Sequence, residues 1–147
     1  MSKDVNNRYD VTDLTSLEKL EPVRVRPGMY IGSTGTKGLH HCIWEILDNS
    51  IDEISNGYGD KATIIINKDK SITVIDNGRG IPTGIHPTKK KSGVEMVFTE
   101  LHTGGKFNNK NYKTSGGLHG VGASVVNALS DWLEVQICNE GKIYKQR

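Results

Sequence analysis

The residues with the clearest potential for chemistry lie between positions 39 and 60, where acidic side chains occur without any basic ones. This stretch holds five acids and no Lys or Arg, whereas the rest of the chain holds all 19 Lys and Arg against 12 acids. At 100° per residue, one side of a helix would carry His41, Glu45, Asp48, Asn49 and Asp52. Exposed helix faces usually mix charges that pair at i,i+4, so this face is either simply solvated or holds a divalent cation and a reacting water.

A second group of polar residues follows an apolar run and reads DNGRG at positions 76–80. Asp, Asn and Gly are common in turns, because Asp and Asn bond their own backbone and Gly adopts positive φ. An ordinary turn is therefore one interpretation. In the other, the Asp76 carboxylate at a strand end accepts a hydrogen bond from an exocyclic amine and so selects one nucleobase.

A third group is the glycine-bearing sequence GLHGVG at positions 117–122, directly before an apolar run that ends at residue 129. Glycine loops that open a helix expose backbone N–H groups to an anion, and the helix dipole adds to the attraction. The spacing is GxxGxG, so it matches neither the Walker A loop nor the dinucleotide-binding fingerprint. By itself this segment is equally compatible with a tight turn before a helix.

Composition narrows the class of protein. The 147 residues suit about one domain, and 17 glycines favour loops shaped by the backbone. Two distant cysteines suggest neither a disulfide scaffold nor a zinc site. There is no apolar run long enough for a membrane span and no apolar signal core at the N-terminus, so we expect a soluble, cytoplasmic protein with no membrane partner.

The expected elements begin with helices and a hairpin. A short helix is predicted at residues 15–20, ended by Pro22, and a loop at 24–32. A long helix is predicted at 38–56, stopped by Gly57. A hairpin of strands 62–67 and 72–76 follows, then a loop at 77–92 with three lysines, and a short helix at 94–101.

The second part of the chain should hold the long glycine loop, residues 104–122, with six glycines in 19 positions. A helix is predicted from 122 to 129, and strands at 132–138 and 143–147 around a turn at 139–141. Long loops in compact domains usually bind ligands or act as lids. The element order indicates helices layered on one sheet face, and the short hairpins argue against an all-parallel sheet.

Together these motifs resemble the ATP-binding domain of type IIA DNA topoisomerase B subunits. The resemblance covers nearly the whole chain and includes VRPGMYIG at 25–32, GGKF at 104–107 and SGGLHGVG at 115–122. Matches of that length are specific to the bacterial gyrase and topoisomerase IV group. The wider GHKL family, with Hsp90, MutL and histidine kinases, implies the Bergerat ATP-binding fold: an α+β two-layer sandwich with helices on one face of a mixed, mostly antiparallel sheet, here C-terminally incomplete.

The resemblance also implies ATP and Mg²⁺ as cofactors and assigns roles residue by residue. Glu45 corresponds to the general base, His41 to its supporting residue, and Asn49 to the Mg²⁺ ligand. Asp76 is similar to the carboxylate that accepts the adenine amine, and Arg79, Gly80 and Pro82 line the nucleotide rim. Further ATP-binding positions implied are Tyr9, Lys106, Tyr112, Lys113, Gly117, Leu118, His119, Gly120, Val121, Gly122 and Ala123.

The resemblance further implies a partial GHKL ATPase domain at 1–147, with a dimerisation arm at 1–14 and an ATP lid at 104–122. Family members form homodimers through this arm, join an A subunit in an A2B2 heterotetramer and act on double-stranded DNA. Their later strands and a lysine that contacts the γ-phosphate have no counterpart here, so we expect weak nucleotide binding and negligible hydrolysis by these residues alone. The alternatives are a binding-only fragment or another GHKL ATPase; a histidine kinase is disfavoured because only 37 residues precede the long helix.

Overall fold

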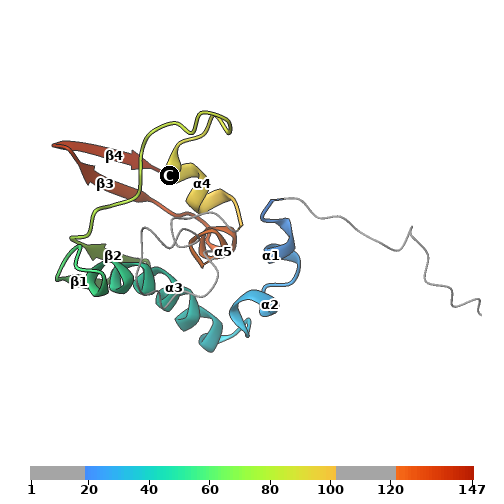
Figure 1. Ribbon diagram of the computed structural model, residues 1–147. Helices are drawn as coiled ribbons and strands as arrows, with labels where there is room; N and C mark the ends of the chain where they lie inside the picture. The colour runs from blue at the N-terminus through green and yellow to red at the C-terminus, as the bar shows by residue number, and fades with distance from the viewer. Residues whose placement is uncertain (1–18, 102–121) are drawn as a thin grey trace, which may run out of the picture.

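The computed structural model describes residues 19–101 and 122–147 (Figure 1). The described elements are, in chain order, α1 (Glu21–Val25), α2 (Gly28–Ile31), α3 (Thr36–Ser55), β1 (Ala62–Ile66), β2 (Ile72–Asp76), α4 (Gly93–Thr99), α5 (Gly122–Leu129), β3 (Val135–Asn139) and β4 (Lys142–Gln146). These bounds agree with the expected long helix, first hairpin and residue 122–129 helix to within two residues at each end. The strand expected from residue 132 begins at Val135.

Helices α1 and α2 correct the expectation for residues 19–32, whereas residues 15–18 of the expected short helix lie outside the described residues. Pro22 does not end a helix; it lies in the first turn of α1, where a missing N–H costs no hydrogen bond. The expected loop at 24–32 contains the one-turn helix α2, which ends at Gly32 with φ of 73°. Left-handed backbone of this kind strongly favours glycine, so Gly32 sets where the chain turns toward α3.

Helix α3 is the longest described element, and its buried residues are Gly38, Ser50, Asp52 and Glu53. Burial on this helix does not follow hydrophobicity, because Leu39 is 67% exposed while Asp52 is 3% exposed. Buried carboxylates require partners, so the side of α3 that carries these acids must be matched by polar groups from elsewhere in the fold.

The strands form two separate antiparallel hairpins within the described residues, β1–β2 and β3–β4. Helices together with these antiparallel strands confirm the expected α+β class. In the first hairpin Ala62 pairs with Asp76 and Ile66 with Ile72, which places Asp76 at the open end of the hairpin, where Ser50 of α3 bonds to it. Glu140 and Gly141, both with positive φ, form the tight turn of the second hairpin.

Helix α5 joins the layers by packing against α1, α3 and α4 (Figure 1). The main apolar cluster is small and consists of Val23, Ile31, Val125 and Ala128, with Leu20, Tyr30, Cys42, Leu101 and Leu129 packed around it. Arg24 adds a cross-link by donating from Nε to the carbonyl of Ala128 at 3.0 Å. The core therefore holds α1 and α2 against α5, and α5 beside α3.

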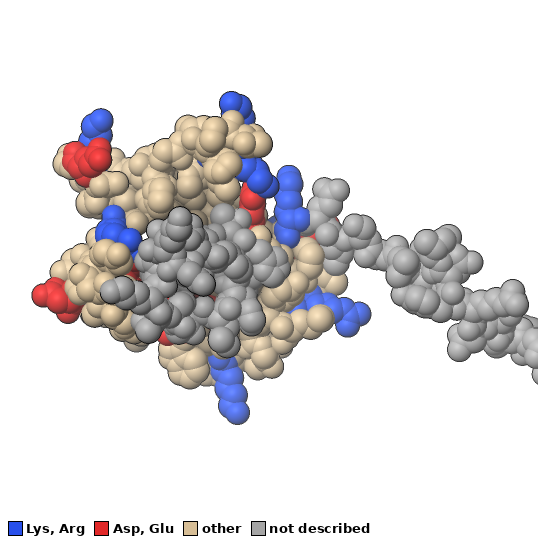
Figure 2. Space-filling view, in the orientation of Figure 1, with Lys and Arg blue, Asp and Glu red and all other residues tan. Residues whose placement is uncertain are grey.

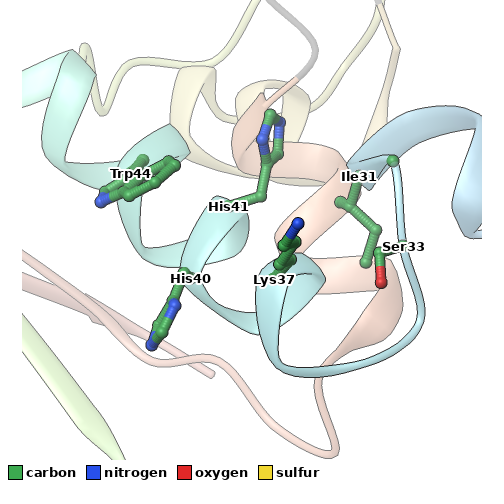
Figure 3. A pocket seen from close by; sticks show the side chains of 7 residues that line it. Ile31, Ser33, Lys37, His40, His41 and Trp44 are labelled. Carbon is green, nitrogen blue, oxygen red and sulfur yellow. The ribbon is translucent and has the colours of Figure 1, made fainter.

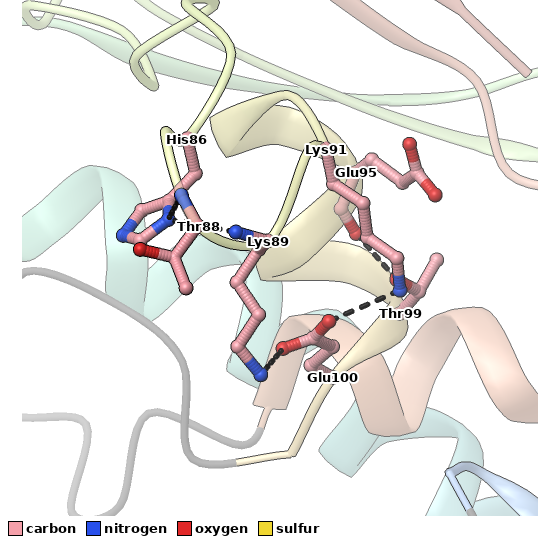
Figure 4. Close-up of polar contacts among 7 residues, drawn as sticks. All are labelled: His86, Thr88, Lys89, Lys91, Glu95, Thr99 and Glu100. Atoms are coloured by element: carbon pink, nitrogen blue, oxygen red, sulfur yellow. Dashed lines mark hydrogen bonds and ion pairs between the residues drawn. The ribbon is translucent and has the colours of Figure 1, made fainter.

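The loop between β2 and α4 is tied down by charged and backbone contacts (Figure 4). Lys91 Nζ and Lys89 Nζ lie 3.0 and 3.4 Å from the carboxylate of Glu100, and the pKa of Glu100 is lowered by these lysines, mainly by the hydrogen bond from Lys91. His86 Nδ1 accepts from the backbone N–H groups of Thr88 and Lys89. Elsewhere on the face in Figure 2, Lys and Arg side chains project from several separate places.

The loop also depends on a close backbone approach at Gly93. A Cβ at Gly93 would collide with the carbonyl oxygen of Pro82, whereas a Cβ at Gly84, in the same loop, would meet nothing within 4 Å. Neither glycine has a positive φ, so the two positions differ in the room available for a Cβ atom.

We expect Gly93→Ala to lower the free energy of unfolding by about 1–3 kcal/mol, the usual range for overpacking. Gly84→Ala should be neutral or stabilise by about 0.4–1 kcal/mol, because alanine restricts the unfolded chain. Urea unfolding of the two variants beside the parent measures both. Equal stability of the two variants would contradict the close packing of Pro82 on Gly93.

Candidate functional site

One line of polar residues runs along α3. His41, Glu45, Asn49 and Glu53 recur every four residues and therefore lie on one side of the helix, over roughly 18 Å at 1.5 Å per residue. This stripe, His41–Glu45–Asn49–Glu53, is approached at one end by Gly122 of α5 and at the other by the turn after β2. It brings together residues from all three motifs singled out in the sequence.

The first end of the stripe is an imidazole–carboxylate pair. His41 Nε2 lies 2.9 Å from Glu45 Oε1, and the two side chains are 38% and 29% exposed. A Cβ at Gly122 would collide with the Glu45 carboxylate, so glycine is required where α5 begins. Glu45 thus lies at the N-terminus of α5, where a carboxylate is favoured by the helix dipole, and it remains open to solvent for a water molecule.

Asn49 occupies the next turn of the stripe. Its Nδ2 donates to the backbone oxygen of Glu45 at 3.2 Å, which leaves the amide oxygen available as a ligand. No group of three His, Cys, Asp or Glu side chains in the described segments could hold a metal. The single amide oxygen of Asn49 suits Mg²⁺, which commonly takes one or two protein oxygens and completes its shell with phosphate and water.

The carboxylate of Asp76 is fixed by two donors. Ser50 Oγ donates to one oxygen at 2.6 Å, and the backbone N–H of Gly78 donates to the other at 2.9 Å. Each carboxylate oxygen has more than one acceptor site, so Asp76 can accept a further hydrogen bond from a ligand. The fully buried Ser50, at 2% exposed, had no signal in the sequence beyond its position one residue after Asn49.

Arg79 is held by Glu53, which corrects the expectation that the acids of this helix lack a cationic partner. The Arg79 guanidinium makes two hydrogen bonds to Glu53, from the NH2 nitrogen at 2.8 Å and from Nε at 3.1 Å, and its backbone N–H adds a third at 3.0 Å. The guanidinium carbon lies 3.4 Å from the ring centre of Tyr58. A pair separated by 26 residues lies outside i,i+4 reasoning, and Tyr58 had no motif to reveal it.

The remaining predicted positions divide into two groups. Gly80, with φ of 77°, comes close to Ile137 of β3, Pro82 approaches Gly93, and Ala123 is buried in the first turn of α5. Outside the described residues lie Tyr9, Lys106, Tyr112, Lys113, Gly117, Leu118, His119, Gly120 and Val121, together with the arm at 1–14 and nearly all of the lid at 104–122. The structure thus brings together Glu45, Asn49, Asp76, Arg79 and Gly122 along α3.

An open pocket of about 370 Å³ lies beside the first end of the stripe (Figure 3). Lys37, His40, His41 and Trp44 line it from α3, and residues 31–33 line it from the preceding turn. His41 is the only predicted site residue among them. The rings of His40 and Trp44 stack with centres 6.4 Å apart, on the outer surface of the helix.

Residues 34–144 match the family described as "Histidine kinase-, DNA gyrase B-, and HSP90-like ATPase". The chain therefore belongs to this family of ATPases. No helix in the described ranges is long and apolar enough to cross a bilayer.

Particular relatives share most of the sequence. The B subunit of DNA topoisomerase 4 from Staphylococcus aureus strain MW2 is 62% identical over 140 residues, which is 95% of this chain and 21% of the relative, and the same protein of strain Mu50 matches equally. The 43K ATPase domain of Thermus thermophilus gyrase B, solved with an aminocoumarin, superposes with a TM-score of 0.73 at 47% identity over 86% of this chain and 30% of that one. The chain spans about a fifth of the curated relatives it matches.

The thiol of Cys42 reports on the charge of Glu45. Cys42 is half-buried, and this burial together with the nearby Glu45 carboxylate raises its pKa above the ordinary value. Cys138 is an exposed free thiol in the same chain and serves as an internal reference.

We expect Glu45→Gln to lower the Cys42 pKa, because it removes the negative charge that disfavours the thiolate. Since the thiolate is the nucleophile, iodoacetamide should then alkylate Cys42 faster at fixed pH, and its pH–rate curve should move to lower pH. Mass spectrometry against Cys138 measures this, with Asp69→Asn as the control. An unchanged Cys42 profile in Glu45→Gln would show that the carboxylate does not act on the thiol.

Proposed function

We propose that this chain is the ATP-binding and ATP-hydrolysing part of a type II DNA topoisomerase B subunit, of the gyrase or topoisomerase IV kind. The observation that carries the proposal is the stripe on α3, with Glu45 next to Gly122 at one end and Glu53 next to the Asp76 turn at the other. One end suits a hydrolysed phosphate and the other a nucleobase.

At the phosphate end, Glu45 acts as the general base. Its carboxylate takes a proton from a water that attacks the γ-phosphate, and His41, 2.9 Å away, orients it. Phosphoryl transfer needs positioning and charge stabilisation more than covalent chemistry, so a fixed carboxylate suffices. The backbone N–H groups at the start of α5 lie at the same end and stabilise negative charge there.

Asn49 supplies the protein ligand for Mg²⁺ through its amide oxygen. When bound, Mg²⁺ neutralises phosphate charge and lowers the barrier to transfer. At the other end of the stripe, Asp76 accepts the adenine amino group, and Arg79, Gly80 and Pro82 form the rim of the base site. The proposed lid and arm residues Lys106, Tyr112, Lys113 and Tyr9 and the loop Gly117–Val121 complete the nucleotide contacts.

The proposal includes a cytoplasmic protein that forms homodimers through residues 1–14 and works with an A subunit on double-stranded DNA. Its support is the 62% identity to the B subunit of S. aureus DNA topoisomerase 4.

Nucleotide binding by the 147-residue chain tests the base site. We expect weak, Mg²⁺-dependent binding of ATP in preference to GTP, measured by calorimetry. Asp76→Asn should reduce ATP affinity by about 1–3 kcal/mol, since an amide mispairs with the adenine amine. Asp69→Asn, at the opposite end of the same hairpin, is the matched control. Equal ATP affinity and unchanged preference over GTP in Asp76→Asn would remove Asp76 from the site.

Turnover tests the general base, in the chain extended to the length of its S. aureus relative. Glu45→Gln should leave ATP binding nearly intact and abolish hydrolysis, because the side chain acts on water rather than on ATP. Glu134→Gln, whose parent residue pairs with Lys145 near β3, is the control. A rate within about tenfold of the parent, roughly 1.4 kcal/mol of barrier, would reject Glu45 as the base.

A further inference from the structure

The turn at residues 76–79 is held at every position by the segment between residues 50 and 61. Ser50 donates to Asp76, Glu53 binds Arg79, and a Cβ at Gly78 would lie 3.0 Å from the Glu53 side chain. The remaining residue, Asn77, has no role in the proposed chemistry, yet it makes the most extensive contacts of the four with the entry to β1.

Asn77 uses both atoms of its amide. Its Oδ1 accepts from the backbone N–H groups of Asp60 and Lys61, both at 3.0 Å. Its Nδ2 donates to the Asp60 carboxylate at 2.7 Å. The backbone N–H of Asn77 adds a bond to the Lys61 carbonyl at 3.3 Å, which extends the β1–β2 ladder by one residue. Four hydrogen bonds therefore join one residue to a two-residue stretch.

The geometry couples Asn77 to its neighbour. Successive side chains of a strand point to opposite faces, so Asp76 reaches α3 through Ser50 while Asn77 reaches the start of β1. A Cβ at Gly59 would lie 2.8 Å from Asn77 Oδ1 and 3.0 Å from its carbonyl oxygen. Gly59 thus allows the segment before β1 to come close to Asn77, so Asp76 is held by α3 and the next residue is held by the segment at 59–61.

We propose that Asn77 is a positioning residue for nucleotide recognition: its bonds to Asp60 and Lys61 hold the Asp76 carboxylate in the orientation that accepts adenine. This inference rests on the proposed function. Asn77 would thus influence which base is bound without contacting the nucleotide. An amide is required at this position, because the same side chain must accept from two N–H groups and donate to a carboxylate.

The test exchanges the amide and the carboxylate. Asn77→Asp keeps the acceptor oxygens but loses the donor and faces Asp60 with a second negative charge. We expect ATP affinity at neutral pH to fall about fivefold or more, the equivalent of one net hydrogen bond, with the preference over GTP reduced. The double variant Asp60→Asn, Asn77→Asp restores one donor and one acceptor across the contact, and its ATP affinity should return to within about twofold of the parent.

A matched control separates positioning from stability. Asn67, at the opposite end of the hairpin, donates to Ser71 at 3.0 Å and Thr73 at 2.9 Å. Asn67→Asp removes these donors without touching the turn at 76–79, so it should lower the unfolding midpoint and leave ATP affinity and the ATP/GTP ratio unchanged. If Asn77 served stability alone, Asn77→Asp would likewise lower the unfolding midpoint and leave ATP affinity and the ATP/GTP ratio unchanged.

Gly59→Ala disturbs the same contact without changing any residue of the turn, because the new Cβ would crowd Asn77 Oδ1. It should also lower ATP affinity. It decides the matter if Asn77→Asp does not fold, which circular dichroism will show. Parent-like ATP affinity in folded Asn77→Asp, or in Gly59→Ala if that variant stands alone, overturns the inference, as does a failure of the double variant to rescue. If the parent binds no adenine nucleotide, both the proposed function and the inference fail. If the parent binds ATP and the variants bind it equally well, the inference alone fails.

Discussion

The rest of the structure depends on the inward position of a charged helix face. Asp52 and Glu53 of α3 are 3% and 9% exposed, and a carboxylate removed from water is costly unless it is paired. For Glu53 the partner is Arg79, which satisfies both carboxylate oxygens and then rests on Tyr58. Because this partner lies just beyond β2, the pairing fixes the first hairpin against α3.

The inward-facing carboxylates of α3 also explain why glycine is found at two positions beside this helix. Gly122 and Gly78 are the points at which the backbone approaches Glu45 and Glu53, and a Cβ at either position would press on the carboxylate-bearing side chain. At these two glycines the lack of a side chain lets the backbone come close to α3. In the turn after β2, the backbone N–H groups of Gly78 and Arg79 donate to the carboxylates of Asp76 and Glu53, so these polar groups are preorganised.

Local patterns predicted much of the fold. The β1–β2 hairpin and the extent of α3 and α5 follow from periodicity and turn residues, whereas the grouping of Glu45, Asn49, Asp76 and Gly122 was implied by the family resemblance. The solved gyrase B ATPase domain agrees with the fold. Pro22 was misjudged because its role depends on which helix turn it occupies. The Glu53–Arg79 pair and the Tyr58 stack could not be predicted, because they join positions whose proximity exists only after α3 and β2 have packed.

A helix that uses its inner face for charge gives up apolar burial there. The main described cluster is built on four buried residues, Val23, Ile31, Val125 and Ala128, none of which comes from α3 or the hairpins. Isoleucines of the first hairpin remain largely open, Ile66 at 78% and Ile75 at 50% exposed. Hydrophobic stabilisation therefore concentrates at α1, α2 and α5, while polar contacts hold α3 to β2. A ligand bound to both the stripe and the turn after β2 would add contacts between α3 and β2 and, by mass action, contribute RT ln(1 + [L]/Kd) to the stability of the folded chain. For the proposed nucleotide, recognition and folding would then draw on the same contacts along α3.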